Sequence, residues 1–188
     1  MINGVVGVSW VFAALLAVGS SPPPSASAQT PTSDEAQPAT PVFDGVFRFV
    51  GGNAQRDAVT EAVERAVQAL LPVFHELARK RLGTANTVPP KVSMSMDGDD
   101  LVIVYGDLDP MRAPLDGSVR SWHNREGTKC KLTHERRGDQ IVQTSWSISG
   151  RRVMVWSLAE DGKALRLHST MTSMHLPVAI DYRLSFRK

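Results

Sequence analysis

The side chains best suited to chemistry are scattered along this sequence. Its five histidines are His75, His123, His134, His168 and His175. No two of them stand at the short spacings by which a helix or a turn presents two ligands to a metal. We therefore predict no metal site and assign no catalytic residue among them.

Acidic residues also lack a chemical pattern. The run DGDD, Asp97 to Asp100, could suggest calcium, but a loop of the EF-hand kind needs acids at alternate positions and a distal Glu. Here LVIV follows, so we expect a hairpin turn. No nucleophile elbow, phosphate-binding loop or dinucleotide fingerprint occurs. We predict no cofactor and no reaction. An enzyme with helices over a cone-shaped sheet and a His or Asp inside stays an alternative.

Aromatic, methionine and leucine side chains offer a different chemistry, that of an adaptable apolar cavity. They stand on stretches that alternate apolar and polar residues. If the strands enclose a space, these side chains would line it; if they do not, the same side chains fill a core. The candidates for lining a ligand pocket are Met94, Met96, Trp146, Leu167, Met171, Tyr182, Leu184 and Phe186.

The elements that position these candidates are strands. The stretch SWSISGRRVMVWSLAEDGKALRLHSTM, Ser145 to Met171, holds three mostly alternating runs joined by two tight turns. In the last strand, Ile180, Tyr182, Leu184 and Phe186 face one way, and the polar residues between them face the other. Eight such strands follow residue 90, with the short connections of an antiparallel meander.

Helices precede this meander. Apolar residues recur at three- and four-residue steps between residues 53 and 82, which predicts an amphipathic helix. Asn53 is a suitable N-cap and Gly83 a suitable C-cap. Pro72 lacks the amide proton that a helix interior needs, so it either kinks one helix or separates two. One strand, Val46–Val50, comes before them.

The order of elements predicts an α+β fold that is mainly antiparallel β. We expect a meander barrel or strongly curved sheet of 8–9 strands, with a kinked helix or helix pair inserted after the first strand. This order resembles the fatty-acid-binding branch of the calycin barrels. The stretch FDGVFRFV, Phe43 to Val50, is similar to the opening strand of that family. The resemblance implies a lipid ligand. The residues that hold a ligand carboxylate in that family cannot be assigned in this chain, because Tyr182 and Arg183 are adjacent and point to opposite faces. Lipocalins are also exported proteins, but their helix follows the barrel, whereas the helices of this chain precede most of its strands.

The N-terminus indicates export. Val5 to Val18 is an apolar run, short for a membrane span, and ASA at 26–28 suits cleavage. We predict a signal peptide at 1–28, a flexible Pro/Ser/Thr-rich tether at 29–41 and a single barrel-like domain at 42–188. An uncleaved anchor is the alternative. Cys130 is the sole cysteine, so no internal disulfide forms, and we expect a small buried hydrophobe there.

Charge points away from nucleic acid. The chain of 188 residues has 21 Lys and Arg against 19 Asp and Glu, a balance too even for a nucleic-acid footprint. We therefore predict an exported, periplasmic or extracellular, soluble carrier for a small apolar, lipid-like ligand, without catalysis or membrane insertion. A non-enzymatic envelope or protein-interaction module with a filled core is the alternative.

Overall fold

The computed structural model describes residues 42–124 and 127–188. The predicted signal peptide at 1–28 and tether at 29–41 lie outside these residues. Within the described ranges, no helix is long and apolar enough to cross a membrane.

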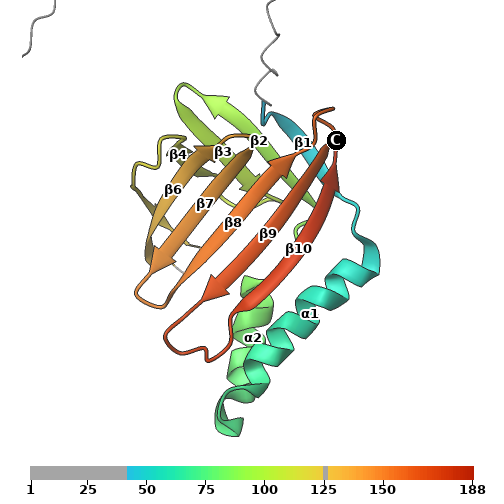
Figure 1. The fold of residues 1–188 in the computed structure, drawn as a ribbon. Helices are drawn as coiled ribbons and strands as arrows, with labels where there is room; N and C mark the ends of the chain where they lie inside the picture. Colours follow the sequence, from blue (N-terminus) through green and yellow to red (C-terminus); the bar gives the residue numbers. More distant parts are fainter. Residues whose placement is uncertain (1–41, 125–126) are drawn as a thin grey trace, which may run out of the picture. The chain divides into compact units, whose positions relative to one another are not determined.

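Ten antiparallel strands and two α-helices make up the described part of the chain (Figure 1). The α+β class, mainly antiparallel, is therefore confirmed. In chain order the elements are β1 Gly45–Phe49, α1 Gly52–Gln68, the 3-10 turn η1 Pro72–Phe74, α2 His75–Ala85, β2 Lys91–Asp97, β3 Asp100–Tyr105, β4 Met111–Pro114, β5 Arg120–His123, β6 Lys129–Arg137, β7 Gln140–Ser147, β8 Gly150–Leu158, β9 Ala164–Thr172 and β10 Ile180–Arg187.

The sheet curls into a nearly closed barrel. Its strands follow the order β4-β3-β2-β1-β10-β9-β8-β7-β6-β5. The first strand, β1, pairs with β2 on one side and with the last strand, β10, on the other. Residues just after β4 bond to β6 on the far side: the Gly117 amide donates to the His134 carbonyl, and the Arg136 amide donates to the Leu115 carbonyl, both at 2.9 Å. These bonds bring the two ends of the sheet together, which leaves few exposed edge groups.

The expected count of 8–9 strands is too low. The missing strand is β4, Met111–Pro114, which pairs with β3 through Met111 and Ile103. It has four residues, follows Pro110 and ends at Pro114, so its alternation is too short to recognise in the sequence. Tertiary pairing rather than local propensity forms this strand.

Pro72 separates two helices rather than kinking one. Leu71 is extended at ψ 139°, and η1 begins at Pro72. The helices also extend beyond the expected 53–82. Asn53 is not the N-cap, since α1 begins at Gly52, whose φ of 62° turns the chain sharply out of β1. Gly83 lies within α2, which ends at Ala85.

The core lies inside the curled sheet and beneath α1. Alternate residues of each strand point inward, and the buried face of α1 joins the same apolar cluster. Figure 1 shows both helices together at one end of the strands. That buried face consists of Val59, Ala62, Val63, Ala66 and Val67.

Candidate functional site

The inner face of β8, β9 and β10 forms a regular array of side chains. The register places Met154, Ser169 and Tyr182 in one row across the three strands. The next row toward the helices holds Arg152 and Met171. On the other side the rows become wholly apolar, with Trp156, Leu167 and Leu184, then Leu158, Leu165 and Phe186. The row of Arg152 also holds the apolar Ile180 on β10, so this end of the face mixes polar and apolar side chains and the rest is apolar.

Six of the eight predicted pocket residues meet on the inside of the barrel. They are Met94 on β2 together with Leu167, Met171, Tyr182, Leu184 and Phe186 on β9 and β10. Met96 shares the inner face of β2 but lies at its end, where 45% of it is exposed. Trp146 points to the outer face, because its neighbours in register are Lys131 and Arg151. It therefore cannot line the interior.

Arg152 is a cation on the inner face of β8. It is half-buried, and its Nη2 donates to Asn86 Oδ1 at 2.8 Å and lies 3.2 Å from Met171 Sδ. Among the described residues, no carboxylate lies within ion-pair distance of it. A guanidinium has five N–H donors, so most of them are available at this position.

Two hydroxyl groups lie near this cation. Ser169 is fully buried, and its Oγ has no hydrogen-bond partner within the described chain. Tyr182 stands beside Ser169 in the register. Burial raises the pKa of Tyr105 well above its ordinary value, and the charge of Arg152 opposes that rise. We name Arg152, its contacts Asn86 and Met171, and the neighbouring row residues Ser169 and Tyr182 the Arg152 cluster.

A second polar network crosses the middle of the barrel. The Tyr105 hydroxyl on β3 donates to Gln143 Oε1 on β7, and Trp156 Nε1 approaches the same oxygen at 3.4 Å. Gln143 Nε2 in turn lies 3.3 Å from Met111 Sδ on β4. The network joins β3 and β4 at one end of the sheet to β7 and β8 near the other end, and so it links the two ends across the closure between β4 and β6.

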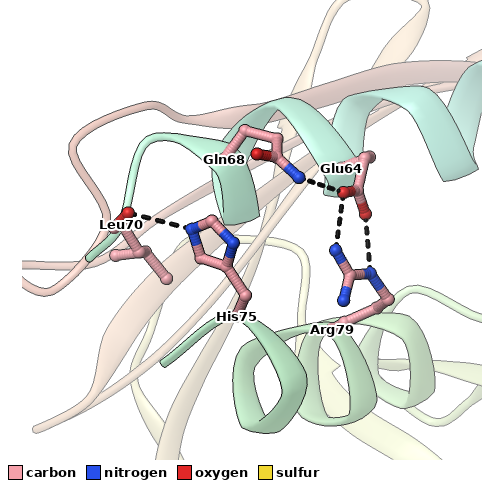
Figure 2. A network of polar contacts seen from close by, with 5 residues as sticks. All are labelled: Glu64, Gln68, Leu70, His75 and Arg79. Carbon is pink, nitrogen blue, oxygen red and sulfur yellow. Dashed lines mark hydrogen bonds and ion pairs between the residues drawn. The ribbon is translucent and has the colours of Figure 1, made fainter. Parts of the chain in front are cut away.

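A groove between α1 and α2 leads toward the Arg152 cluster. It encloses about 290 Å³, and its lining includes Val59, Val63 and the almost fully buried Asn86. Asn86 therefore separates the groove from Arg152. Figure 2 shows the wall of the groove, where Arg79 donates to both oxygens of Glu64.

Cys130 and His134, the other buried residues with reactive or titratable side chains, belong to the packed interior. Cys130 is buried, as predicted, and burial raises the pKa of its thiol. His134 is fully buried, with Nδ1 3.3 Å from the Ala113 carbonyl oxygen and Nε2 without a partner in the described chain. Burial lowers the pKa of His134 to about 4. No group of three or more His, Cys, Asp or Glu that could hold a metal occurs in 42–124 and 127–188.

Arg152 is not among the predicted site residues. Adjacent arginines beside a turn are typical of a solvated rim, and Arg151 is indeed exposed, whereas Arg152 is half-buried on the inner face. The signal was present in the alternation, because Arg152 has the same parity as Met154 and Trp156. The turn residues before it concealed that parity.

Comparison with known proteins returned likenesses of structure alone. No family model and no curated protein matches the chain. Among solved structures, a fatty-acid-binding protein from Drosophila melanogaster brain is 14% identical, with a TM-score of 0.47 over 78% of this chain and 100% of its own. Fatty-acid-binding protein 1 of Echinococcus granulosus is 11% identical, with a TM-score of 0.49 over 78% and 96%. A Schistosoma mansoni fatty-acid-binding protein in complex with arachidonic acid is 17% identical, with a TM-score of 0.45 over 78% and 95%.

These values describe a distant resemblance, which carries no argument about the ligand of this chain. The fold assignment rests on the strand order and pairing of the chain itself. The three solved structures described above are fatty-acid-binding proteins, which are barrels of the calycin type.

Proposed function

We propose that this protein is an exported, non-enzymatic carrier that binds a small apolar ligand through an acidic head group. The observation that carries the proposal is Arg152, a half-buried guanidinium on the inner face of the barrel without an acidic partner among the described residues. An unpaired charge in such a place is costly. An anionic group on the ligand would offset that cost by charge-assisted hydrogen bonds.

The rest of the cluster suits the same head group. Ser169 Oγ and the Tyr182 hydroxyl can donate to a carboxylate, and the apolar rows beyond them suit an acyl chain or a ring system. The interior is closely filled in the form described, since Leu167, Leu184 and Phe186 are all almost fully buried. Ligand uptake therefore requires α2, with Asn86 at its C-terminal end, to move away from Arg152 and the interior side chains to repack.

The decisive experiment compares an acid with its ester. Dansylaminoundecanoic acid and its methyl ester share one apolar body, and their dansyl fluorescence rises on burial. We expect the acid to bind more tightly than the ester. We expect Arg152→Gln to lower the affinity for the acid by about tenfold or more, since a hydrogen bond to a charged group contributes about 1.5–3 kcal/mol. The ester should bind Arg152→Gln and the unaltered protein equally.

Arg183→Gln is the matched control, because Arg183 lies exposed on the outer face of β10. It should bind the acid as the unaltered protein does. Equal binding of acid and ester, or an equal loss in both variants, would remove the head-group assignment.

A second candidate function is the interaction module with a filled core. The near-complete burial of the inner apolar side chains favours it. Absence of binding for both acid and ester, with a well-folded protein, would move the proposal to this module.

A further inference from the structure

The outer face of the sheet holds a hollow that the carrier function does not use. It encloses about 680 Å³ over β6, β7 and β8, beside the turn between β7 and β8 and the residues that follow β9. Its lining residues have the opposite parity to the interior ones. Thr144, for example, lies between Gln143 and Ser145 on β7, and Gln143 points into the barrel.

Three threonines line this hollow. The register sets Thr133, Thr144 and Val153 side by side across β6, β7 and β8, and Thr172 lies beside Arg151. None of the three hydroxyls makes a side-chain hydrogen bond within 42–124 and 127–188. Since each hydroxyl offers one donor and two acceptor lone pairs, together they form a hydrogen-bonding surface that a ligand can use.

Trp146 supplies an aromatic ring beside these hydroxyls. It is half-buried in the row next to Thr144. Among the described side chains, no ring and no cation stacks on its indole. Its face is therefore available for contact with the C–H groups of a bound molecule.

The charges of the hollow are unequal. Glu135 and Arg137 satisfy each other in a bidentate pair, with Nε to Oε1 at 2.9 Å and Nη2 to Oε2 at 2.7 Å. Arg151 is exposed and has no acidic partner within the described chain. Arg151, which lies beside Trp146 in the register, is therefore available to bind an anionic group in the hollow.

An aromatic face, several hydroxyls and one unpaired guanidinium fit a polar ring that carries an acid. We propose that this hollow binds an acidic saccharide, with the sugar ring against Trp146, its hydroxyls on Thr133, Thr144 and Thr172, and its carboxylate on Arg151. A purely apolar ligand would leave the threonines and Arg151 without partners, which disfavours it. This site is separate from the Arg152 cluster, because the two lie on opposite faces of β8.

Titration of the isotope-labelled protein with glucuronate, followed by amide and indole NMR shifts, tests the proposal. Glucose serves as the neutral sugar and acetate as the acid without a ring. We expect glucuronate to shift the Trp146 indole and the amides of Thr133 and Thr144. Arg151→Gln should weaken glucuronate binding about tenfold, to the level of glucose. Arg166→Gln, on the outer face of β9 outside the hollow, should leave it unchanged.

Trp146→Ala should abolish the shifts caused by glucuronate and by glucose. If that variant loses its folded spectrum, Arg151→Gln decides alone, because Arg151 is exposed and its removal leaves the fold intact. Absence of shifts at these residues, or equal shifts with acetate, would overturn the proposal. Neither result depends on whether the barrel interior binds an apolar acid.

Discussion

Glu64 on α1 and Arg79 on α2 form a bidentate ion pair, with Nε to Oε2 at 2.9 Å and Nη2 to Oε1 at 2.7 Å. Gln68 Nε2 donates to Oε1 of the same carboxylate at 2.6 Å, and His75 anchors the start of α2 to the Leu70 carbonyl (Figure 2). These contacts tie the two helices together beside the groove that leads to Asn86.

Loss of this pair should free α2. Only Leu82 of α2 is buried, so the ion pair adds to a small number of contacts that hold this helix, although an exposed pair contributes little to stability. We expect Glu64→Gln to speed amide hydrogen exchange of α2 severalfold and to leave the exchange of β8 and β9 unchanged. Glu61→Gln, on the exposed side of α1, is the control. Equal exchange in α2 for both variants would contradict this role.

Acid should release the same contact. The hydrogen bonds from Arg79 lower the pKa of Glu64 from 4.5 to about 2. A carboxylate with a lowered pKa stabilises the folded form above its ordinary pKa, and that contribution falls as the pH drops toward about 2. Hydrogen exchange of α2 should therefore accelerate across this interval, and Glu64→Gln should remove that dependence.

Global stability should depend on His134 at a higher pH. Burial lowers its pKa from 6.5 to about 4, so the unfolded chain binds a proton that the folded chain resists. The contribution of His134 to the free energy of unfolding is therefore fully present above pH 6.5. It is lost as the pH falls from 6.5 to about 4, by about 3 kcal/mol in total. Urea unfolding at several pH values measures it. His134→Gln, which does not titrate at this position, should lose about 3 kcal/mol less over the same pH interval; an equal loss in both proteins would contradict the assignment.

Phe186 should be among the most costly core residues to truncate. It is 1% exposed, and its ring centroid lies 5.8 Å from that of Phe49 and 6.1 Å from that of Trp156. We expect Phe186→Ala to lower the free energy of unfolding by about 3–5 kcal/mol. Ile148→Ala, at a side chain 91% exposed, should change it by about 0.5 kcal/mol or less. A small effect at Phe186 would indicate that the interior already contains space.

The strands were predictable because burial on one face imposes a two-residue period. Tyr182, Leu184 and Phe186 could be placed on one inner face from their spacing alone, and so could Leu167 and Met171 opposite them. The break at Pro72 was predictable as well, though not its outcome, which depends on how α2 packs. Trp146 was misplaced because both faces of β7 are partly apolar, so its alternation does not distinguish inside from outside.

The polar contacts within the barrel were not predictable in this way. The Tyr105–Gln143 contact joins β3 and β7, which come near each other only through closure of the sheet between β4 and β6, and no local pattern encodes such a pairing. Arg152 was concealed by the turn beside it, and its partner Asn86 comes from the far end of the helical segment. The position of each depends on closure of the sheet, which alternation alone does not specify.

The central claim is that the barrel carries an apolar acid on Arg152. Its most direct test is native mass spectrometry of the protein secreted from an exporting host and purified without detergent, beside the Arg152→Gln variant. We predict an added mass on the unaltered protein that is lost on denaturation, belongs to an apolar acid and is strongly reduced on the variant. Equal added mass on both proteins, or a bound molecule without an acidic group, would contradict the claim.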